Sequence, residues 1–242
     1  MNYDHTVTVS LDGQWYDFAA RKTNSGLNIT DKIVLREIFH ENVYQIEEGM
    51  FNDSGIAIDI GANIGAFSIF AAGMGAKKVY AYEPEEGNFG VLKTNIKQNN
   101  LDKVIKAIDW GVLDERRDVE LYGGQGASFV EGVKTLTGAA KKMIVNKETA
   151  RQTIKCVSLE SVFADNKVSS CDVLKIDVEG SEYEIIAGAK PEILAKAKFI
   201  TMEFHNADEQ TFGLMIAKLT KSHNLHIIGK HDEGGQIYGY RY

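Results

Sequence analysis

The stretch from Gly55 to Gly73 constrains the fold of this chain more than any other part of its sequence. Its first half predicts a buried strand over residues 56–60, followed by a tight turn with glycines at positions 61 and 65 and then by an apolar helix. Glycine accepts the unusual backbone angles of such a turn and leaves room for a close approach. The start of the helix offers free N–H groups and a positive dipole end. This order of elements is typical of a nucleotide-type pocket.

A second strand ends in an acid about 20 residues after the turn. The run Lys78-Val-Tyr-Ala-Tyr-Glu-Pro predicts a strand that carries Glu83 to the edge of the sheet where the glycine turn lies. At this spacing a neighbouring strand delivers a carboxylate to the hydroxyls of a ribose. An ordinary strand–turn–helix junction with convenient glycines is the alternative interpretation.

The turn differs from the dinucleotide fingerprint. From Asp59 to Gly65 it reads Asp-x-Gly-x-Asn-x-Gly, whereas a pyrophosphate cradle has the pattern Gly-x-Gly-x-x-Gly. An acid at the end of the first strand would repel a diphosphate and suits a ligand with a positive end. S-adenosylmethionine has a sulfonium, an ammonium and a ribose, and it carries no phosphate. The residues therefore favour S-adenosylmethionine as the ligand.

Composition limits the class of partner. The 242 residues, of which 44% are hydrophobic and 25% charged, fit one large globular α/β domain. The net charge of −7 disfavours binding to nucleic acid or to an anionic membrane. No apolar run has the length of a membrane span, the N-terminus does not resemble a signal peptide, and Cys156 and Cys171 have no metal-ligand spacing. We expect a cytoplasmic protein, and the sequence does not specify its oligomeric state.

Alternating strand and helix patterns predict the fold class. Residues 1–20 have the pattern of a hairpin around Asp12-Gly13, and a helix pattern follows from Asp31. We therefore divide the chain into an N-terminal hairpin and helix extension, residues 1–50, and a ligand-binding domain, residues 51–242. In the second part strands alternate with helices before a closing antiparallel pair, which indicates an α/β fold with a mostly parallel sheet covered on both faces.

The third strand ends at Asp109 and Trp110, where a doubly wound site contacts the adenine. Residues 123–152 are the least periodic part of the chain and include the cations Lys141, Lys142, Lys147 and Arg151. A solvated face is the default interpretation of this basic stretch. A mobile flap that contacts an anionic substrate is the alternative.

Five polar side chains follow two later strands, which end at Asp177 and at His205. They are Asp177, Glu179, Glu182, Glu203 and His205. We expect the two strands to be neighbours, so that these groups lie close together. Glu179 and Glu182 are also in position to cap the helix that starts at Ser181.

The chain resembles the FkbM-type family of S-adenosylmethionine-dependent methyltransferases. The resemblance rests on segments between about residues 35 and 230, and the Lys-Ile-Asp-Val-Glu-Gly block is the most specific of them. The matching segments are Ile58-Asp-Ile-Gly-Ala-Asn-Ile-Gly65, Glu83-Pro84 with Asn88, Leu92 and Asn95, Leu174-Lys-Ile-Asp-Val-Glu-Gly-Ser-Glu182 with Ala187-Gly-Ala189, and Met202-Glu-Phe-His205.

The resemblance implies a class I methyltransferase fold, a Rossmann-like seven-stranded sheet whose last strand is antiparallel. It also implies methyl transfer, commonly to a hydroxyl oxygen, and here to a small molecule or glycan. Glu83 would accept both ribose hydroxyls, and Asp109 would accept from the adenine amino group. The cofactor-binding residues expected are Asp59, Gly61, Ala62, Asn63, Gly65, Glu83, Pro84, Asp109, Trp110 and Asp177.

Methyl transfer needs an aligned nucleophile and a group that takes its proton. We expect His205 to be the general base, because an imidazole accepts a proton near neutral pH. Asp177 would orient the substrate or the cofactor, with Glu179 beside it. A hydrogen-bonded structural histidine is the alternative role for His205. A metal held by Asp177, Glu203 and His205 is chemically possible, although we assign none.

The sequence is compatible with two other functions. One is a methyltransferase of the same fold that acts on RNA or protein, which the negative charge and the lack of a Lys/Arg-rich added domain disfavour. The other is a non-catalytic module that binds the cofactor, in which the acids of the second cluster serve the structure alone. The sequence does not identify the acceptor.

Overall fold

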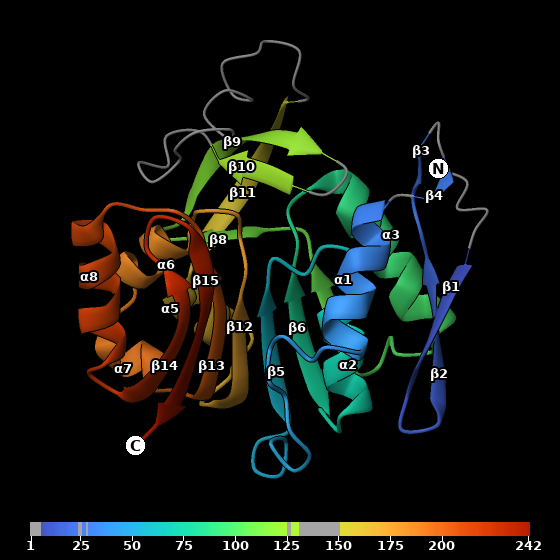
Figure 1. Ribbon diagram of the computed structural model, residues 1–242, viewed down its shortest axis with the longest axis horizontal. Coiled ribbons are helices and arrows are strands. Elements are labelled where there is room, and N and C mark those ends of the chain that lie inside the picture. The colour runs from blue at the N-terminus through green and yellow to red at the C-terminus, as the bar shows by residue number, and fades with distance from the viewer. Residues whose placement is uncertain (1–5, 24–25, 28, 125–126, 131–150) are drawn as a thin grey trace.

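Seven strands form the central sheet of the protein, in the order β14-β15-β13-β12-β5-β6-β7 (Figure 1). The computed structural model describes residues 6–23, 26–27, 29–124, 127–130 and 151–242. All the strands run parallel except β15, which is antiparallel to both of its neighbours. The predicted mostly parallel sheet with an antiparallel last strand is confirmed. The strands are β5 (Ile56–Ile60), β6 (Lys78–Tyr82), β7 (Ile105–Ile108), β12 (Cys171–Ile176), β13 (Ala197–Phe204), β14 (His223–Lys230) and β15 (Gly234–Arg241).

Helices cover both faces of this sheet, because successive residues of its strands are apolar on both sides. On β5, Ala57 belongs to one hydrophobic cluster and Ile58 to the other, and both are fully buried. The first cluster includes α1 (Ile29–Phe39), α2 (Ala66–Gly73) and α3 (Glu86–Gln98). The second includes α5 (Leu159–Asp165), α6 (Glu182–Gly188), α7 (Pro191–Leu194) and α8 (Glu209–Leu219). Among the described residues, no helix combines the length and apolar character that crossing a membrane requires.

The N-terminal extension shares the first of these clusters. Strands β1 (Thr6–Leu11) and β2 (Gln14–Ala19) form the predicted hairpin, and Asp12 and Gly13 have positive φ angles of 48° and 82° in its turn. Phe18 is fully buried and meets Phe39 of α1 edge to face, with ring centroids 5.6 Å apart. The hairpin is followed by the short strands β3 (Lys22–Thr23) and β4 (Gly26–Leu27). The boundary at residue 50 therefore divides the chain within one continuous core.

A small second sheet lies beyond the carboxyl ends of β5 and β6 (Figure 1). Its order is β10-β9-β11-β8, and β11 pairs in parallel with β8 and antiparallel with β9. The strands are β8 (Gly111–Leu113), β9 (Arg117–Gly124), β10 (Ala127–Val130) and β11 (Arg151–Ser158). The greater part of the predicted flap, including Lys141, Lys142 and Lys147, lies outside the described residues.

Candidate active site

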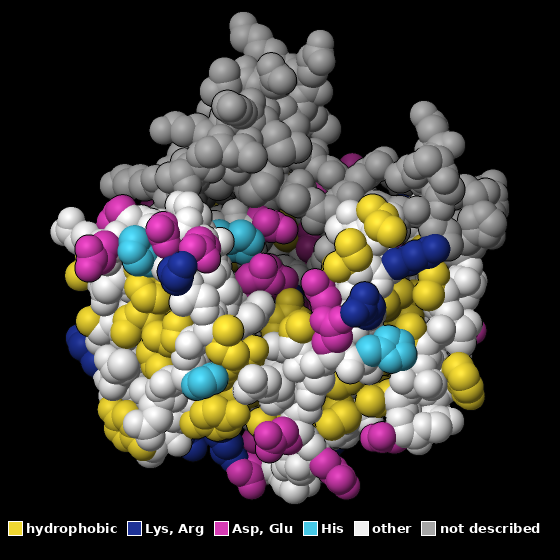
Figure 2. All heavy atoms as spheres, viewed as in Figure 1, with side chains coloured by type: hydrophobic (Ala, Val, Ile, Leu, Met, Phe, Trp, Pro, Cys, Tyr) yellow, Lys and Arg dark blue, Asp and Glu magenta, His cyan; other side chains and the backbone are white. Residues whose placement is uncertain are grey.

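Two cavities meet at the carboxyl ends of the central strands, and four residues line both of them: Gly61, Asn63, Asp177 and Glu179. The first cavity extends from there towards the small sheet, and Glu83 and Trp110 are among its lining residues. The second extends between α1 and the ends of β12 and β13, and its lining includes Tyr44. Figure 2 shows acidic side chains gathered at the centre of this face, beside a histidine.

The glycine turn is shaped by contacts within the protein itself. Gly61 has a φ of +78°, and a Cβ there would lie 1.8 Å from the carbonyl oxygen of Asp177. Gly65 has a φ of +87°, and its Cβ would lie 2.5 Å from Leu92 Cδ1. The sequence predicted glycines that make room for a ligand. In the structure, the end of β12 and helix α3 occupy that space, so these glycines bring the turn against its neighbours.

Asp59 lies behind this turn, fully buried and outside the lining of both cavities. Its Oδ2 accepts from Ser68 Oγ at 2.7 Å, and its Oδ1 lies 3.1 Å from the ammonium of Lys175. Asp59 therefore faces neither cavity in this structure, and the cofactor contact expected of it stays a prediction. Its carboxylate is instead held inside the protein by Ser68 of α2 and by Lys175, its partner in the β5–β12 register.

Lys175 is the residue that the sequence reasoning missed. It is buried, and Nζ donates to the carbonyl oxygen of Gly61 at 2.7 Å and lies 3.6 Å from Asp177 Oδ2. Burial lowers its pKa, but the charges of Asp59 and Asp177 more than offset this and raise the pKa above the ordinary value. Lys175 is thus a permanent cation beneath the turn. The sequence signal that could have identified this residue is a lysine within the otherwise apolar end of β12.

Asp177 lies where the two cavities join, and Tyr44 holds its side chain. Tyr44 donates its hydroxyl to Asp177 Oδ2 at 2.9 Å, and its ring packs edge to face against Phe67 at 5.3 Å. Burial, followed by the charge of Asp177, raises the pKa of Tyr44 well above its usual value, so the phenol remains a donor. Tyr44 therefore packs in the core with its ring and reaches the second cavity with its hydroxyl group.

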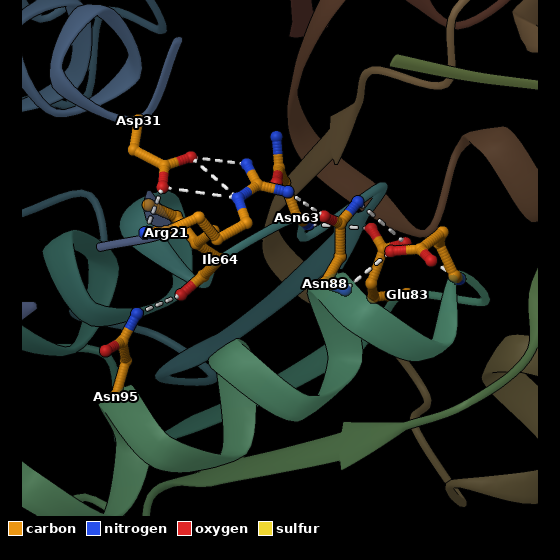
Figure 3. Close-up of polar contacts among 8 residues, drawn as sticks. Arg21, Asp31, Asn63, Ile64, Glu83, Asn88 and Asn95 are labelled. Carbon is orange, nitrogen blue, oxygen red and sulfur yellow. Dashed lines mark hydrogen bonds and ion pairs between the residues drawn. The ribbon is translucent and has the colours of Figure 1, made fainter. Parts of the chain in front are cut away.

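Glu83 is buried at the end of β6 and faces the first cavity (Figure 3). Its Oε2 accepts from the backbone N–H of Asn63 at 2.8 Å, and its Oε1 from the N–H of Glu85 at 2.9 Å. Burial raises its pKa to about 7, although these donors lower it. The carboxylate is thus fixed by backbone groups. Since a carboxylate has about four acceptor positions, it retains capacity for ligand hydroxyls.

Of the residues predicted at the adenine end of the site, some line the first cavity and one does not. Trp110 and Pro84 line the first cavity together with apolar groups of β8, β9 and β11, such as Val112 and Ile154. Asp109 is exposed and lines a neighbouring hollow instead. The structure therefore brings Trp110, but not Asp109, into the cavity with Glu83, and the adenine contact of Asp109 stays a prediction.

His205 follows β13 and lies between carboxylates. Nδ1 is 3.2 Å from Glu182 Oε1, and Nε2 is 3.2 Å from Glu179 Oε2. Burial lowers the pKa of His205, but the hydrogen bonds and charges of Glu179 and Glu182 outweigh it and raise the pKa to about 11. The imidazole is therefore protonated at neutral pH, and His205 is not among the residues that line either cavity.

Glu203, two residues earlier and within β13, does line the second cavity. Burial and the neighbouring charge of Asp177 raise its pKa to about 7. Ligand atoms of Asp177, Glu203 and His205 lie within 4.8 Å of one another, as the metal alternative requires. However, both ring nitrogens of His205 already face carboxylates. A cation could use this imidazole only after one of these ion pairs opens.

The glycine turn after β5, the carboxylate after β6 and the antiparallel strand β15 define a class I methyltransferase. Over residues 59–242 the chain matches the family model of the methyltransferase FkbM domain, and it belongs to this family.

Among its relatives is the 31-O-demethyl-FK506 methyltransferase FkbM of Streptomyces tacrolimicus, 25% identical over 220 residues that cover 83% of this chain and 84% of that protein. Methyltransferase sdnD of Sordaria araneosa is 28% identical over 187 residues, 68% of this chain and 71% of that protein. The AMB antimetabolite synthetase AmbE of Pseudomonas aeruginosa is 23% identical over 228 residues, and the match covers 81% of this chain but only 11% of that protein. A crystal structure of methyltransferase FkbM from Methylobacillus flagellatus shares the fold, with a TM-score of 0.51, 15% identity and coverage of 86% of this chain and 53% of that one.

Proposed function

We propose that this methyltransferase uses S-adenosylmethionine to methylate a hydroxyl oxygen of a small molecule or glycan. The observation that carries the proposal is the carboxylate of Glu83, held by two backbone N–H groups at the wall of a cavity that joins a second one. This arrangement suits a ribose in the first cavity and an acceptor in the second.

The residues of the first cavity fit this cofactor. Its apolar end at Trp110 and Val112 suits an adenine, and Glu83 suits the two ribose hydroxyls. The buried Oδ1 of Asn63 has no hydrogen-bond partner within the described part of the chain, and this residue lines both cavities. Such an oxygen would accept from an ammonium group of the ligand. When bound, S-adenosylmethionine supplies an electrophilic methyl group on a sulfonium.

The residues of the second cavity fit an acceptor that carries hydroxyl groups. Four acids line it, namely Glu37, Asp177, Glu179 and Glu203. A hydroxyl can donate to any of them, whereas a phosphate would be repelled. Together with the net charge of −7, this lining disfavours RNA as the substrate. The name of the relative from Streptomyces tacrolimicus describes methylation at an oxygen, which supports the same reaction class here.

The acceptor hydroxyl must lose its proton as the new bond forms. His205, the base predicted from the sequence, can take this proton only after it leaves one of its carboxylate partners and loses its own proton. Glu203 lines the cavity and its pKa of about 7 lies near the operating pH. Glu203 therefore meets the requirements of a base in the described arrangement. Asp177, held by Tyr44, is placed to orient a ligand where the two cavities join.

Calorimetric titration tests the cofactor. We expect S-adenosylhomocysteine to bind and NAD to bind much more weakly, because the turn has no phosphate cradle. Glu83→Ala should weaken S-adenosylhomocysteine binding at least tenfold, about the contribution of one hydrogen bond to a charged group. Glu86→Ala, which removes an exposed acid from the same segment, is the matched control. Preferential binding of NAD would refute the proposal.

Radioactive methyl transfer from S-adenosylmethionine to a panel of polyols and sugars then tests the acceptor class.

A further inference from the structure

A buried ion pair in the N-terminal extension carries the first step of the inference. Asp31 is fully buried and Arg21 is 9% exposed. Asp31 Oδ2 accepts from the backbone N–H of Arg21 at 2.8 Å, and Oδ1 accepts from Arg21 Nε at 3.0 Å and also pairs with Nη2. Neither residue lines either cavity. A buried ion pair is by itself weak evidence for stabilisation, so the further contacts of the Arg21 guanidinium decide its role.

The guanidinium of Arg21 continues beyond this pair to helix α3. Its Nη1 donates to Oδ1 of Asn88, which is itself buried and lines the first cavity (Figure 3). An arginine has donors only, so it accepts just one orientation of an asparagine amide, with the oxygen towards the cation. The amide nitrogen of Asn88 must then face the other way.

That nitrogen faces the ribose-binding carboxylate. Asn88 Nδ2 lies 3.5 Å from Glu83 Oε1, and both residues are drawn in the same network in Figure 3. The backbone supports the same contact, because the N–H of Asn88 donates to Glu85 Oε2 at 2.6 Å and the N–H of Glu85 donates to Glu83 Oε1 at 2.9 Å. If the amide turned over, an oxygen would face the carboxylate and repel it.

We propose that Arg21, held by Asp31, is a positioning residue that fixes the Asn88 amide and thereby the Glu83 carboxylate for the ribose of the cofactor. The N-terminal extension is then a working part of the cofactor site. Arg21 and Asp31 both precede residue 59, where the match to the family model begins. The inference rests on the proposed cofactor, and it concerns residues that the proposed function does not use.

Competition with S-adenosylhomocysteine, followed by calorimetry, provides the test. The probes are adenosine and 2′,3′-dideoxyadenosine, because their affinity ratio isolates the contact between the ribose diol and Glu83. In the wild-type protein we expect adenosine to bind at least about tenfold more tightly. Arg21→Met should lower this ratio several-fold, and Arg21→Lys should restore part of it. Arg36→Met is the matched control, because Arg36 is a 75% exposed arginine of α1 whose partner, Glu41, is on the surface.

Asn88→Ala is a second route to the same readout that leaves the buried ion pair intact, in case Arg21→Met does not fold. A lower diol ratio in Arg21→Met, or in Asn88→Ala where Arg21→Met does not fold, supports the inference when the ratio is unchanged in Arg36→Met. An unchanged ratio in a folded Arg21→Met or Asn88→Ala variant overturns it while the cofactor assignment survives. Failure of the wild-type protein to bind S-adenosylhomocysteine overturns the proposed function itself, so the two failures are distinguishable.

Discussion

The ammonium of Lys175 lies 3.1 Å from Oδ1 of Asp59, and both side chains are excluded from solvent. The same ammonium donates to the carbonyl oxygen of Gly61 and faces Asp177. One cation therefore joins two neighbouring strands, the glycine turn and the carboxylate where the cavities meet. The position of the turn depends on this buried charge. Lys175 also forms part of the lining of the second cavity.

Removing this cation should destabilise the fold strongly. We expect Lys175→Met to lower the free energy of unfolding by about 3–5 kcal/mol, because it leaves Asp59 as an unpaired buried charge. Lys230→Met, which removes an exposed lysine paired with Glu233, should cost no more than about 1 kcal/mol. Urea unfolding at neutral pH measures both. A loss below 1 kcal/mol for Lys175→Met would show that Asp59 is satisfied in another way.

Cofactor binding should depend on pH through Glu83, whose pKa burial raises to about 7. Only the ionised form accepts two ribose hydroxyls, so the affinity for S-adenosylhomocysteine should rise up to about pH 8 and fall about tenfold per unit below the pKa. Calorimetry between pH 5.5 and 8.5 measures this. In Glu83→Gln the binding should be weaker, and this step in its pH dependence should vanish. A step that persists in the variant would assign it to another group.

Glu83 also makes the stability of the ligand-free protein depend on pH, and this effect has the opposite sign to the effect on affinity. In the unfolded chain a glutamate has a pKa of about 4.3, so between that value and about 7 the folded state binds more protons at Glu83 than the unfolded state does. Its contribution to stability is present below the unfolded pKa and is lost as pH rises through 7. Ligand-free Glu83→Gln should therefore lose less stability than the wild type between pH 5 and 8, as thermal unfolding would show.

Local patterns predicted the hairpin, the glycine turn and the carboxylate after β6, because each is specified by residues close together in the chain. Asp59 was harder to interpret, because its partner Lys175 comes from another strand and only the folded sheet brings the two together. For His205 the neighbouring acids were predicted, but the ion pairs that occupy both of its ring nitrogens were not. The contact between Arg21 and Asn88 joins residues 67 positions apart, and no spacing rule indicates it. Residue types at strand ends predict a site, whereas the direction of each side chain depends on register.

His205 should remain an imidazolium well above its usual titration range. Burial lowers its pKa, but the contacts with Glu179 and Glu182 raise it to about 11. NMR titration of the ring carbons should show no deprotonation of this histidine up to about pH 9, and its pKa should fall in Glu179→Gln. Stability that depends on this charge is present below about pH 6.5 and declines as pH rises towards 11. Titration of His205 near pH 6.5 would instead restore it as the favoured general base.

Alanine substitutions at two glycines with positive φ angles distinguish the stability cost of backbone strain from the cost of a steric clash. Gly75 has a φ of +102° with no atom near its added Cβ, so Gly75→Ala should cost only the strain, about 1–2 kcal/mol. Gly61 has a φ of +78°, and its Cβ would lie 1.8 Å from the carbonyl oxygen of Asp177. Gly61→Ala must therefore push the turn away from β12, and we expect a loss above about 4 kcal/mol together with loss of S-adenosylhomocysteine binding. Denaturant unfolding and calorimetry measure the two effects. Equal costs for the two variants would mean that the turn relaxes freely and that its contact with Asp177 does not define the site.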